Sequence, residues 1–279
     1  MSPFKAACIQ LRATCSISHN VEEASALIRK AAGDGANYIQ TPEMTHLVAS
    51  NRENLMQKVK LQADDEGVAQ FSKLASDLQV TLHIGSLAIL RDDGKVANRA
   101  FVFGPDGRCL VTYDKIHMFD VDLDNGESWR ESNTYQAGTC SPVVQTQLGA
   151  IGLAICYDVR FPEVFRAQAL AGANILTSPS CFTQQTGMAH WHVLMRARAI
   201  ENGCFMISAA QGGLHEDGRQ TYGHSLIIDP WGNILVEADH DRPGVILADI
   251  DISSAYQARK KIPVLTHGRE FDTSFSTST

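Results

Sequence analysis

The stretch "GANYIQTP" at residues 35–42 has an echo at residues 172–179, where the chain reads "GANILTSP". The two stretches match at Gly, Ala, Asn and Pro, and each follows a segment with helical spacing of apolar residues. Each is therefore interpreted as a helix end, a buried strand and an exit from a sheet. Two such helix–strand units favour an α/β fold in four layers, an α-β-β-α sandwich of two facing mixed sheets with outer helices.

The segments around these two stretches alternate between strand and helix patterns. A three-layer dinucleotide-binding sheet is the competing fold, but the sequence has no Gly-x-Gly-x-x-Gly turn. Asn20 is the predicted N-cap of the first helix. The patterns predict strands at 4–11, 37–43, 81–90 and 245–252, helices at 20–35, 64–80, 162–172 and 190–203, and hairpins at 100–113, 143–156 and 225–238.

Composition limits the classes of function. With 279 residues and 44% hydrophobic content the chain can bury one large core, so we expect a single domain over residues 1–270 and a polar C-terminal tail at 271–279. The net charge of −7 disfavours nucleic acid and membrane surfaces as partners. The start lacks the apolar segment of a signal peptide and no stretch is long enough to span a bilayer, which predicts a cytoplasmic protein with seven free cysteines.

Cys156 ends an apolar run in "GLAICYDVRFPE" (residues 152–163), and Pro162 suits the first turn of a following helix. A thiol at such an elbow lies near partly positive backbone amides, which favour the thiolate, and the Tyr157 amide is in place to donate to an oxyanion. A packed thiol is the competing interpretation. This segment alone favours packing, because free cysteine is among the most buried residue types.

Glu43 and Lys115 are two further candidates. Glu43 in "QTPEMTH" follows a strand and a proline, where α/β proteins tend to place catalytic side chains. Lys115 in "YDKIHMFD" has apolar neighbours, which suit a cation held where an oxyanion forms. Taken singly, a glutamate in a surface turn and a solvated lysine are the commoner interpretations.

Glu43, Lys115 and Cys156 occur in an order, each within its own local phrase, that resembles the Glu-Lys-Cys triad of the nitrilase, or carbon–nitrogen hydrolase, superfamily. The resemblance covers nearly the whole chain, in "AACIQL", "TPE", "DKIHMFDVD", "ESNTYQAG", "GLAICYDVRFPE", "TGMAHWHVLMRARAIEN" and "YGHSLIIDPWG". Within the superfamily the chain resembles the Nit branch. There, "AHWHVLMRARAIEN", "AAQGG" and "TYGHSLIIDPWG" are most similar to the deaminated glutathione amidases.

The resemblance implies the same sandwich, a homodimer or larger homo-oligomer joined across helices, and amide hydrolysis without a metal or an organic cofactor. It implies that Glu43 is the general base, that Cys156 forms a thioester, and that Lys115 and the Tyr157 amide stabilise the oxyanion. Glu131 in "ESNTYQAG" matches the second glutamate that the family uses near the triad. A solvated loop residue is the alternative for Glu131.

The substrate that the resemblance implies is deaminated glutathione, which would be cleaved to 2-oxoglutarate and Cys-Gly. Three related activities stay open: ω-amidase action on α-ketoglutaramate, hydrolysis of N-carbamoyl amino acids, and hydrolysis of nitriles. A non-catalytic binding or scaffold protein is the alternative of another class, although the intact triad disfavours it.

Arg160 lies four residues after Cys156 and is a candidate for binding a substrate carboxylate with both arms of its guanidinium. An ion pair with Glu163 or Asp158 is an equal alternative.

His190 and Trp191 in "AHWHV" belong to a phrase shared with the family and are assigned to substrate binding through the pocket wall. His190 and His192 do not predict a metal site. Neighbours two apart on a helix point to different faces, and the sequence shows no third ligand at a useful spacing.

Overall fold

The structure is a computed structural model that describes residues 2–123, 126 and 128–276, and its strands form two large sheets. In spatial order the first sheet has β16 (Gly244–Ile250), β1 (Phe4–Gln10), β2 (Tyr38–Gln40), β3 (Thr81–Leu90), β4 (Val96–Phe103) and β5 (Cys109–Asp114). The second has β15 (Ile234–Glu237), β14 (Leu226–Ile228), β11 (Phe205–Ser208), β10 (Ile175–Thr177), β9 (Ala150–Gly152) and β8 (Val143–Gln145). Two small hairpins pair β6 (Asp120–Asp122) with β7 (Ser128–Arg130) and β12 (Gly212–Leu214) with β13 (Gln220–Tyr222).

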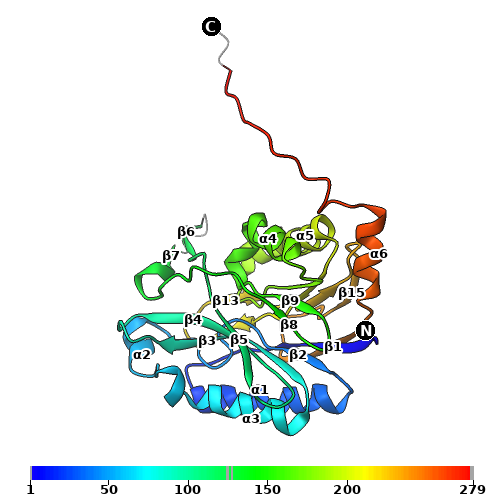
Figure 1. Ribbon diagram of the computed structural model, residues 1–279. Helices are drawn as coiled ribbons and strands as arrows, with labels where there is room; N and C mark the ends of the chain where they lie inside the picture. Colours follow the sequence, from blue (N-terminus) through cyan, green and yellow to red (C-terminus); the bar gives the residue numbers. More distant parts are fainter. Residues whose placement is uncertain (1, 124–125, 127, 277–279) are drawn as a thin grey trace.

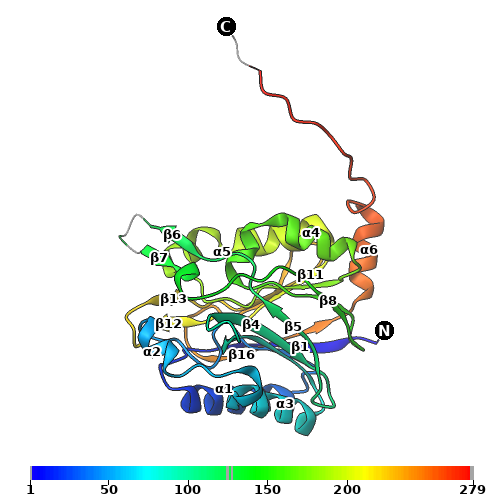
Figure 2. The same ribbon diagram turned by 60° about the vertical axis from the view of Figure 1, so that its left-hand side comes forward.

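Helices cover the outer face of each sheet. Figures 1 and 2 show α1 (Ile17–Gly33) and α3 (Glu66–Leu78) below the first sheet, and α4 (Pro162–Leu170) and α5 (Gln184–Asn202) above the second. This arrangement confirms the predicted α-β-β-α sandwich. The shorter helical segments are α2 (Arg52–Met56), α6 (Ser253–Lys261) and the single turns η1 (Gln62–Asp64), η2 (Glu131–Asn133) and η3 (Cys156–Arg160).

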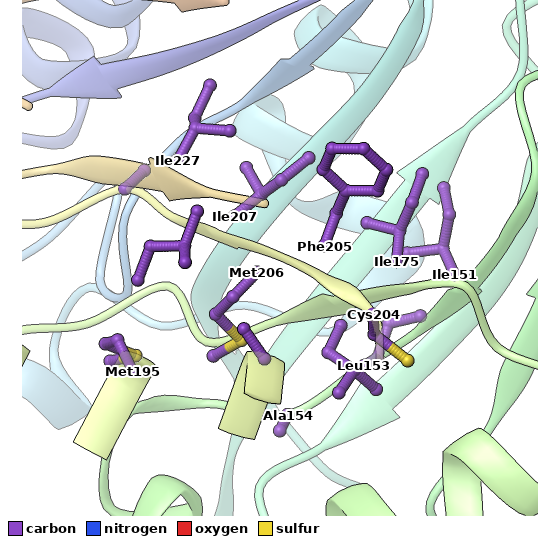
Figure 3. Close-up of a cluster of buried hydrophobic side chains, with 14 of the residues drawn as sticks. Ile151, Leu153, Ala154, Ile175, Met195, Cys204, Phe205, Met206, Ile207 and Ile227 are labelled. Carbon is purple, nitrogen blue, oxygen red and sulfur yellow. The ribbon is translucent and has the colours of Figure 1, made fainter. Parts of the chain in front are cut away.

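The alternation of side chains along the strands explains why the layers stack. In β1, Ala6 and Cys8 belong to the buried cluster that includes residues of both sheets, whereas Ala7 and Ile9 belong to the cluster beneath α1 and α3. Figure 3 shows the same rule in the second sheet, where Ile151, Ile175 and Phe205 lie side by side on neighbouring strands. Both faces of each sheet are therefore apolar, as a four-layer fold requires.

The repeated phrase marks equivalent strands. β2 lies parallel to both β1 and β3, and β10 lies parallel to both β9 and β11. The interpretation of both stretches as buried strands is confirmed. Because parallel strands end at one edge of a sheet, the exits at Pro42 and Pro179 bring chemistry-bearing residues to one end of the sandwich.

The predicted hairpins and strands match the structure to within a few residues, but two helix starts are wrong. Ser16, not Asn20, caps α1, through a bond from the His19 amide to the Ser16 hydroxyl at 3.5 Å. Asn20 is buried within the helix and donates to the His46 carbonyl at 2.9 Å, because a tertiary contact outweighs its capping preference. Helix α5 starts six residues before its predicted position, and α2, α6 and the two small hairpins were not predicted.

The chain after α6 leaves the body as an extended segment (Figure 1), with Phe271 and Phe275 exposed. Residues 277–279 of the predicted tail lie outside the described residues. The division into a single domain and a tail stays a prediction. Among the described residues, no helix has the length and apolar character needed to cross a membrane.

Candidate active site

A pocket with about 710 Å³ of empty space opens at the end of the sandwich where the central strands exit. Its lining includes the predicted site residues Glu43, Lys115, Glu131, Cys156, Tyr157 and Arg160. They come from four separate segments of the chain, the turn after β2, the segment after β5, η2 and η3, so the fold alone brings them together.

The turn that carries Glu43 is held by a bulge in β3. The register between β3 and β4 shifts between Ile84 and Leu87, and Ser86 then accepts from Thr45 N at 2.9 Å and donates to the Pro42 carbonyl at 3.2 Å. Gly85 allows this close approach, because a Cβ there would lie 2.2 Å from the Thr41 carbonyl oxygen. The bulge therefore fixes Glu43 at the pocket floor.

The Glu43 carboxylate is buried and makes three hydrogen bonds. Its Oε1 accepts from Lys115 Nζ at 2.8 Å and from Asn98 Nδ2 at 2.8 Å, and its Oε2 accepts from the Cys181 amide at 2.8 Å. Cys181 follows the exit of β10, so both halves of the repeated architecture contribute to this site. The carboxylate has a fixed orientation, which suits proton transfer.

Lys115 is 2% exposed and lies between two carboxylates. Besides Glu43 it contacts Glu131, whose Oε1 and Oε2 lie 3.1 and 2.8 Å from Nζ. Burial alone lowers the pKa of this lysine, but the charges of Glu131 and Glu43 outweigh burial and raise the pKa well above its usual value. The ammonium is therefore permanently charged at neutral pH.

Glu131 is held by more than Lys115. Its Oε2 accepts from the Phe119 amide at 2.7 Å and its Oε1 accepts from Asn98 Nδ2 at 3.1 Å. The solvated-loop alternative for Glu131 is therefore wrong.

Cys156 stands at a sharp elbow between β9 and α4. Its φ of 48° is in the left-handed region, and its amide donates to the Pro179 carbonyl at 3.0 Å. Such a conformation is strained for a residue with a side chain and persists where the surroundings hold it. Within the described part of the chain the Tyr157 amide has no hydrogen-bond acceptor, so it is free to donate to a ligand.

Asp158 stabilises the elbow through hydrogen bonds. Its buried carboxylate accepts from the Ile155 amide at 2.8 Å, the Tyr113 hydroxyl at 2.6 Å and the His117 amide at 3.0 Å. These bonds join the elbow to the segment that carries Lys115.

The thiol of Cys156 is protonated in the resting site. Burial, together with the negative charge of Glu43, raises its pKa well above the ordinary value, and Lys115 acts in the opposite direction. A thiol, a carboxylate and an ammonium thus meet at the pocket floor. This combination can deprotonate the sulfur during reaction and stabilise an oxyanion.

Arg160 lies on a pocket wall, with its Cζ 5.4 Å from the centre of the Phe182 ring and 5.9 Å from that of Tyr157. Among the described residues, its guanidinium hydrogen-bonds His190 Nδ1 at 3.3 Å. Asp158 is occupied by other donors, and no ion pair joins Arg160 to Glu163 in the described part of the chain. The structural alternative for Arg160 is therefore disfavoured.

Neither His190 nor Trp191 lines the pocket. His190 is exposed and contacts Arg160, whereas Trp191 is fully buried behind Phe182, at a ring-centre distance of 5.2 Å. The assignment of both residues to substrate binding is corrected to a supporting position, because one side chain faces solvent and the other fills the core.

His192 has neighbours that its sequence position does not reveal. His192 Nε2 and His224 Nδ1 lie 2.7 and 2.8 Å from Glu237 Oε1, and the three ligand atoms lie within 4.8 Å of one another. The fold therefore brings together side chains whose spacing in the sequence gave no sign of it. Two imidazole N–H groups donating to one carboxylate oxygen satisfy the cluster, and the prediction of no metal stays untested.

Sequence analysis missed three contributors to the site. Asn98 donates to both glutamates, and the Cys181 amide donates to Glu43. Arg219 lines the pocket wall although it belongs to no recognisable sequence motif. A polar residue within the apolar run "VANRAFVF" was the available signal for Asn98. Arg219 lies in a charged turn that looks like any surface turn.

Comparison with known proteins identifies relatives over nearly the whole length. Residues 5–260 match the family described as carbon-nitrogen hydrolase. The chain is 39% identical to a deaminated glutathione amidase of Synechocystis over 96% of this chain and 98% of that protein. It is 40% identical to a deaminated glutathione amidase of Mus musculus over 96% of this chain and 83% of that one.

Solved structures show the same fold. The Caenorhabditis elegans NitFhit protein superposes with a TM-score of 0.90 at 33% identity, covering 96% of this chain and 66% of that chain. Saccharomyces cerevisiae Nit3, described as a member of branch 10 of the nitrilase superfamily, gives a TM-score of 0.85 at 27% identity, covering 94% and 95%.

Proposed function

The chain belongs to the carbon–nitrogen hydrolase family, and we propose that it is a cofactor-independent amidase that cleaves deaminated glutathione to 2-oxoglutarate and Cys-Gly. The observation that supports this most is the buried contact of Lys115 with Glu43 beside Cys156 at the floor of one pocket. The names of the relatives from Synechocystis and Mus musculus support the choice of substrate.

The first half-reaction forms a thioester. Glu43 accepts the proton of the Cys156 thiol as the sulfur attacks the amide carbon, and a carbon–sulfur bond forms. The oxygen that gains the electron pair is held by Lys115 Nζ and the Tyr157 amide. The carbon–nitrogen bond then breaks, and Glu43 returns its proton to the leaving amine of Cys-Gly.

The second half-reaction consumes water. Glu43 accepts a proton from a water molecule, and the water oxygen attacks the thioester carbon. Lys115 and the Tyr157 amide again hold the oxyanion. The carbon–sulfur bond breaks and 2-oxoglutarate leaves. Glu43 returns the proton to the sulfur, which restores the resting thiol whose raised pKa favours the neutral form.

Arg160 binds the carboxylate of the keto-acid end in this proposal. Its planar guanidinium lies against two aromatic rings on the pocket wall and has no acidic partner among the described residues. A bidentate contact of this kind is strong and directional. It would hold the acyl part of the substrate while the amine part leaves.

The test is a substrate panel with wild type and Cys156→Ala: deaminated glutathione, α-ketoglutaramate, an N-carbamoyl amino acid and a simple nitrile. Released Cys-Gly reports the first substrate and ammonia reports the others. We expect Cys156-dependent turnover with deaminated glutathione strongly preferred, and unchanged turnover in the control Cys140→Ala, because Cys140 is exposed.

Other outcomes of this panel are decisive. Preference for another member would retain the mechanism and replace the substrate. No turnover and no covalent adduct on Cys156 by mass spectrometry would instead favour a binding protein.

A homo-oligomer is part of the proposal. Met188, Val193 and Ile200 on α5 are exposed apolar residues on a helix that forms an outer layer of the sandwich. Pairing of such helices would bury them. Light scattering during size-exclusion chromatography tests this, with a monomer as the contradicting result. The cytoplasmic location stays a prediction from the sequence.

A further inference from the structure

We propose that Arg219 forms a second carboxylate subsite, which binds the terminal carboxylate of the leaving amine and thereby sets the preference for a long, doubly charged amide. The inference rests on the proposed function, since it concerns the other end of the same substrate. It gives a role to a pocket residue that the triad chemistry does not use.

Arg219 lies in the turn between β12 and β13 and faces the pocket that holds Cys156. Its Nε donates to Asp217 Oδ2 at 2.7 Å, and its Cζ lies 4.8 Å from the centre of the Trp129 ring on β7. The side chain is only 19% exposed. The guanidinium is thus held in a fixed plane by an ion pair on one edge and an indole face.

The guanidinium keeps donors for a ligand. An arginine has five N–H groups, and the contact with Asp217 uses the one on Nε. In the described part of the chain Asp217 is the only carboxylate that pairs with Arg219. Arg219 also hydrogen-bonds the side chain of Cys181, and the remaining N–H groups of the planar guanidinium are available to bind a ligand carboxylate.

A second turn in this chain has the same local sequence, and comparing the two turns shows which features of Arg219 belong to the turn and which belong to the pocket. Asp106-Gly107-Arg108, between β4 and β5, repeats Asp217-Gly218-Arg219, and Arg108 Nε also bonds its aspartate, at 2.5 Å. The Arg108 side chain is 81% exposed, however. The ion pair is therefore a feature of the turn itself, and burial against Trp129 in the pocket is what distinguishes Arg219.

The charge of the pocket matches a substrate with two carboxylates. Among the described residues that line it, four are cationic (Lys115, Arg130, Arg160 and Arg219) and two are carboxylates (Glu43 and Glu131). Deaminated glutathione has two carboxylates, one at the keto-acid end and one at the glycine end, with the scissile amide between them. With Arg160 on the keto-acid end, Arg219 is available for the glycine end, which α-ketoglutaramate lacks.

The experiment compares kcat/KM for three substrates: deaminated glutathione, its C-terminal glycinamide, and α-ketoglutaramate. In Arg219→Met we expect kcat/KM for deaminated glutathione to fall by about 10- to 100-fold, mostly through KM, because a charged bidentate contact is lost. The two substrates without the glycine carboxylate should keep their wild-type values. Arg108→Met, the matched control, should change none of the three.

Each other result has a defined meaning. Wild-type kinetics in Arg219→Met on deaminated glutathione would overturn the subsite and leave the amidase proposal intact. An equal loss on all three substrates would assign Arg219 a structural role or the keto-acid carboxylate, and would also overturn it. The double variant Asp217→Asn/Arg219→Met, which leaves no unpaired carboxylate, must repeat the selective loss. Absence of wild-type turnover on deaminated glutathione would overturn both proposals.

Discussion

Lys115 Nζ contacts both carboxylate oxygens of Glu131, at 3.1 and 2.8 Å, while it also contacts Glu43. Two carboxylates therefore share one buried ammonium, and Asn98 Nδ2 donates to both of them. In the proposed mechanism Glu43 gains a proton in the acylation step. Glu131 then supplies the negative charge that keeps Lys115 in place and charged while the oxyanion forms.

Glu131→Gln should therefore lower kcat with little change in KM. The loss should be about 10- to 100-fold, the usual cost of one or two hydrogen bonds to a charged group. Burial lowers the pKa of Lys115 and Glu131 raises it, so the variant should also lose activity at a lower pH than wild type on the alkaline side. Steady-state kinetics across pH measure both effects. The control is Glu163→Gln, at an exposed position on α4. An unchanged kcat for Glu131→Gln would remove Glu131 from the mechanism.

Glu43→Gln should separate the acidity of Cys156 from catalysis. The raised pKa of Cys156 comes from burial and then from the charge of Glu43, so removing that charge lowers the pKa. Alkylation of Cys156 by iodoacetamide should then reach its midpoint at a lower pH than in wild type. Amide turnover should nevertheless fall about 10²- to 10⁴-fold, because the general base is lost. Mass spectrometry of the Cys156 peptide gives the midpoint, with exposed Cys140 as the internal reference; a midpoint that rises would contradict this electrostatic account.

Asp158→Ala should destabilise the fold by about 3 kcal/mol, because it leaves several buried donors without an acceptor. These include the Ile155 amide, the His117 amide and the Tyr113 hydroxyl. Urea unfolding measures the change, and Asp239→Ala on the surface is the control. Wild-type stability in Asp158→Ala would show that water replaces these bonds at little cost and that the elbow does not depend on them.

Gly85→Ala should reduce both stability and turnover, because the added methyl would meet the backbone of Thr41 and Pro42 and the side chain of Pro179. Those contacts displace the turn that carries Glu43 and the carbonyl that holds the Cys156 amide. Overpacking of this kind costs about 1–3 kcal/mol. Gly33→Ala is the matched control, since nothing lies within 4 Å of its added Cβ. Thermal unfolding together with kcat tests the pair, and equal behaviour of the two variants would contradict the role of the bulge.

Local signals in the sequence were sufficient for most elements. The apolar run in "FKAACIQL" and the turns "GPDG" and "DPWG" predicted β1 and two hairpins, because short apolar runs and turn chemistry are properties of neighbouring residues. The same signals failed at the start of α1. Asn20 has the preference of an N-cap, but its amide is satisfied by His46 from another segment.

The sequence by itself determined the four-layer fold, the family and the residue types of the triad, since these follow from periodic patterns and from phrases that persist along the chain. Only the tertiary structure decided which polar side chains share the pocket. Asn98 looks like a strand residue, and Arg108 and Arg219 occupy the same Asp-Gly-Arg turn. One arginine faces solvent, and the other faces the pocket, where Trp129, about ninety positions earlier in the chain, packs against Arg219. Burial depends on contacts between distant segments, and no local pattern encodes it.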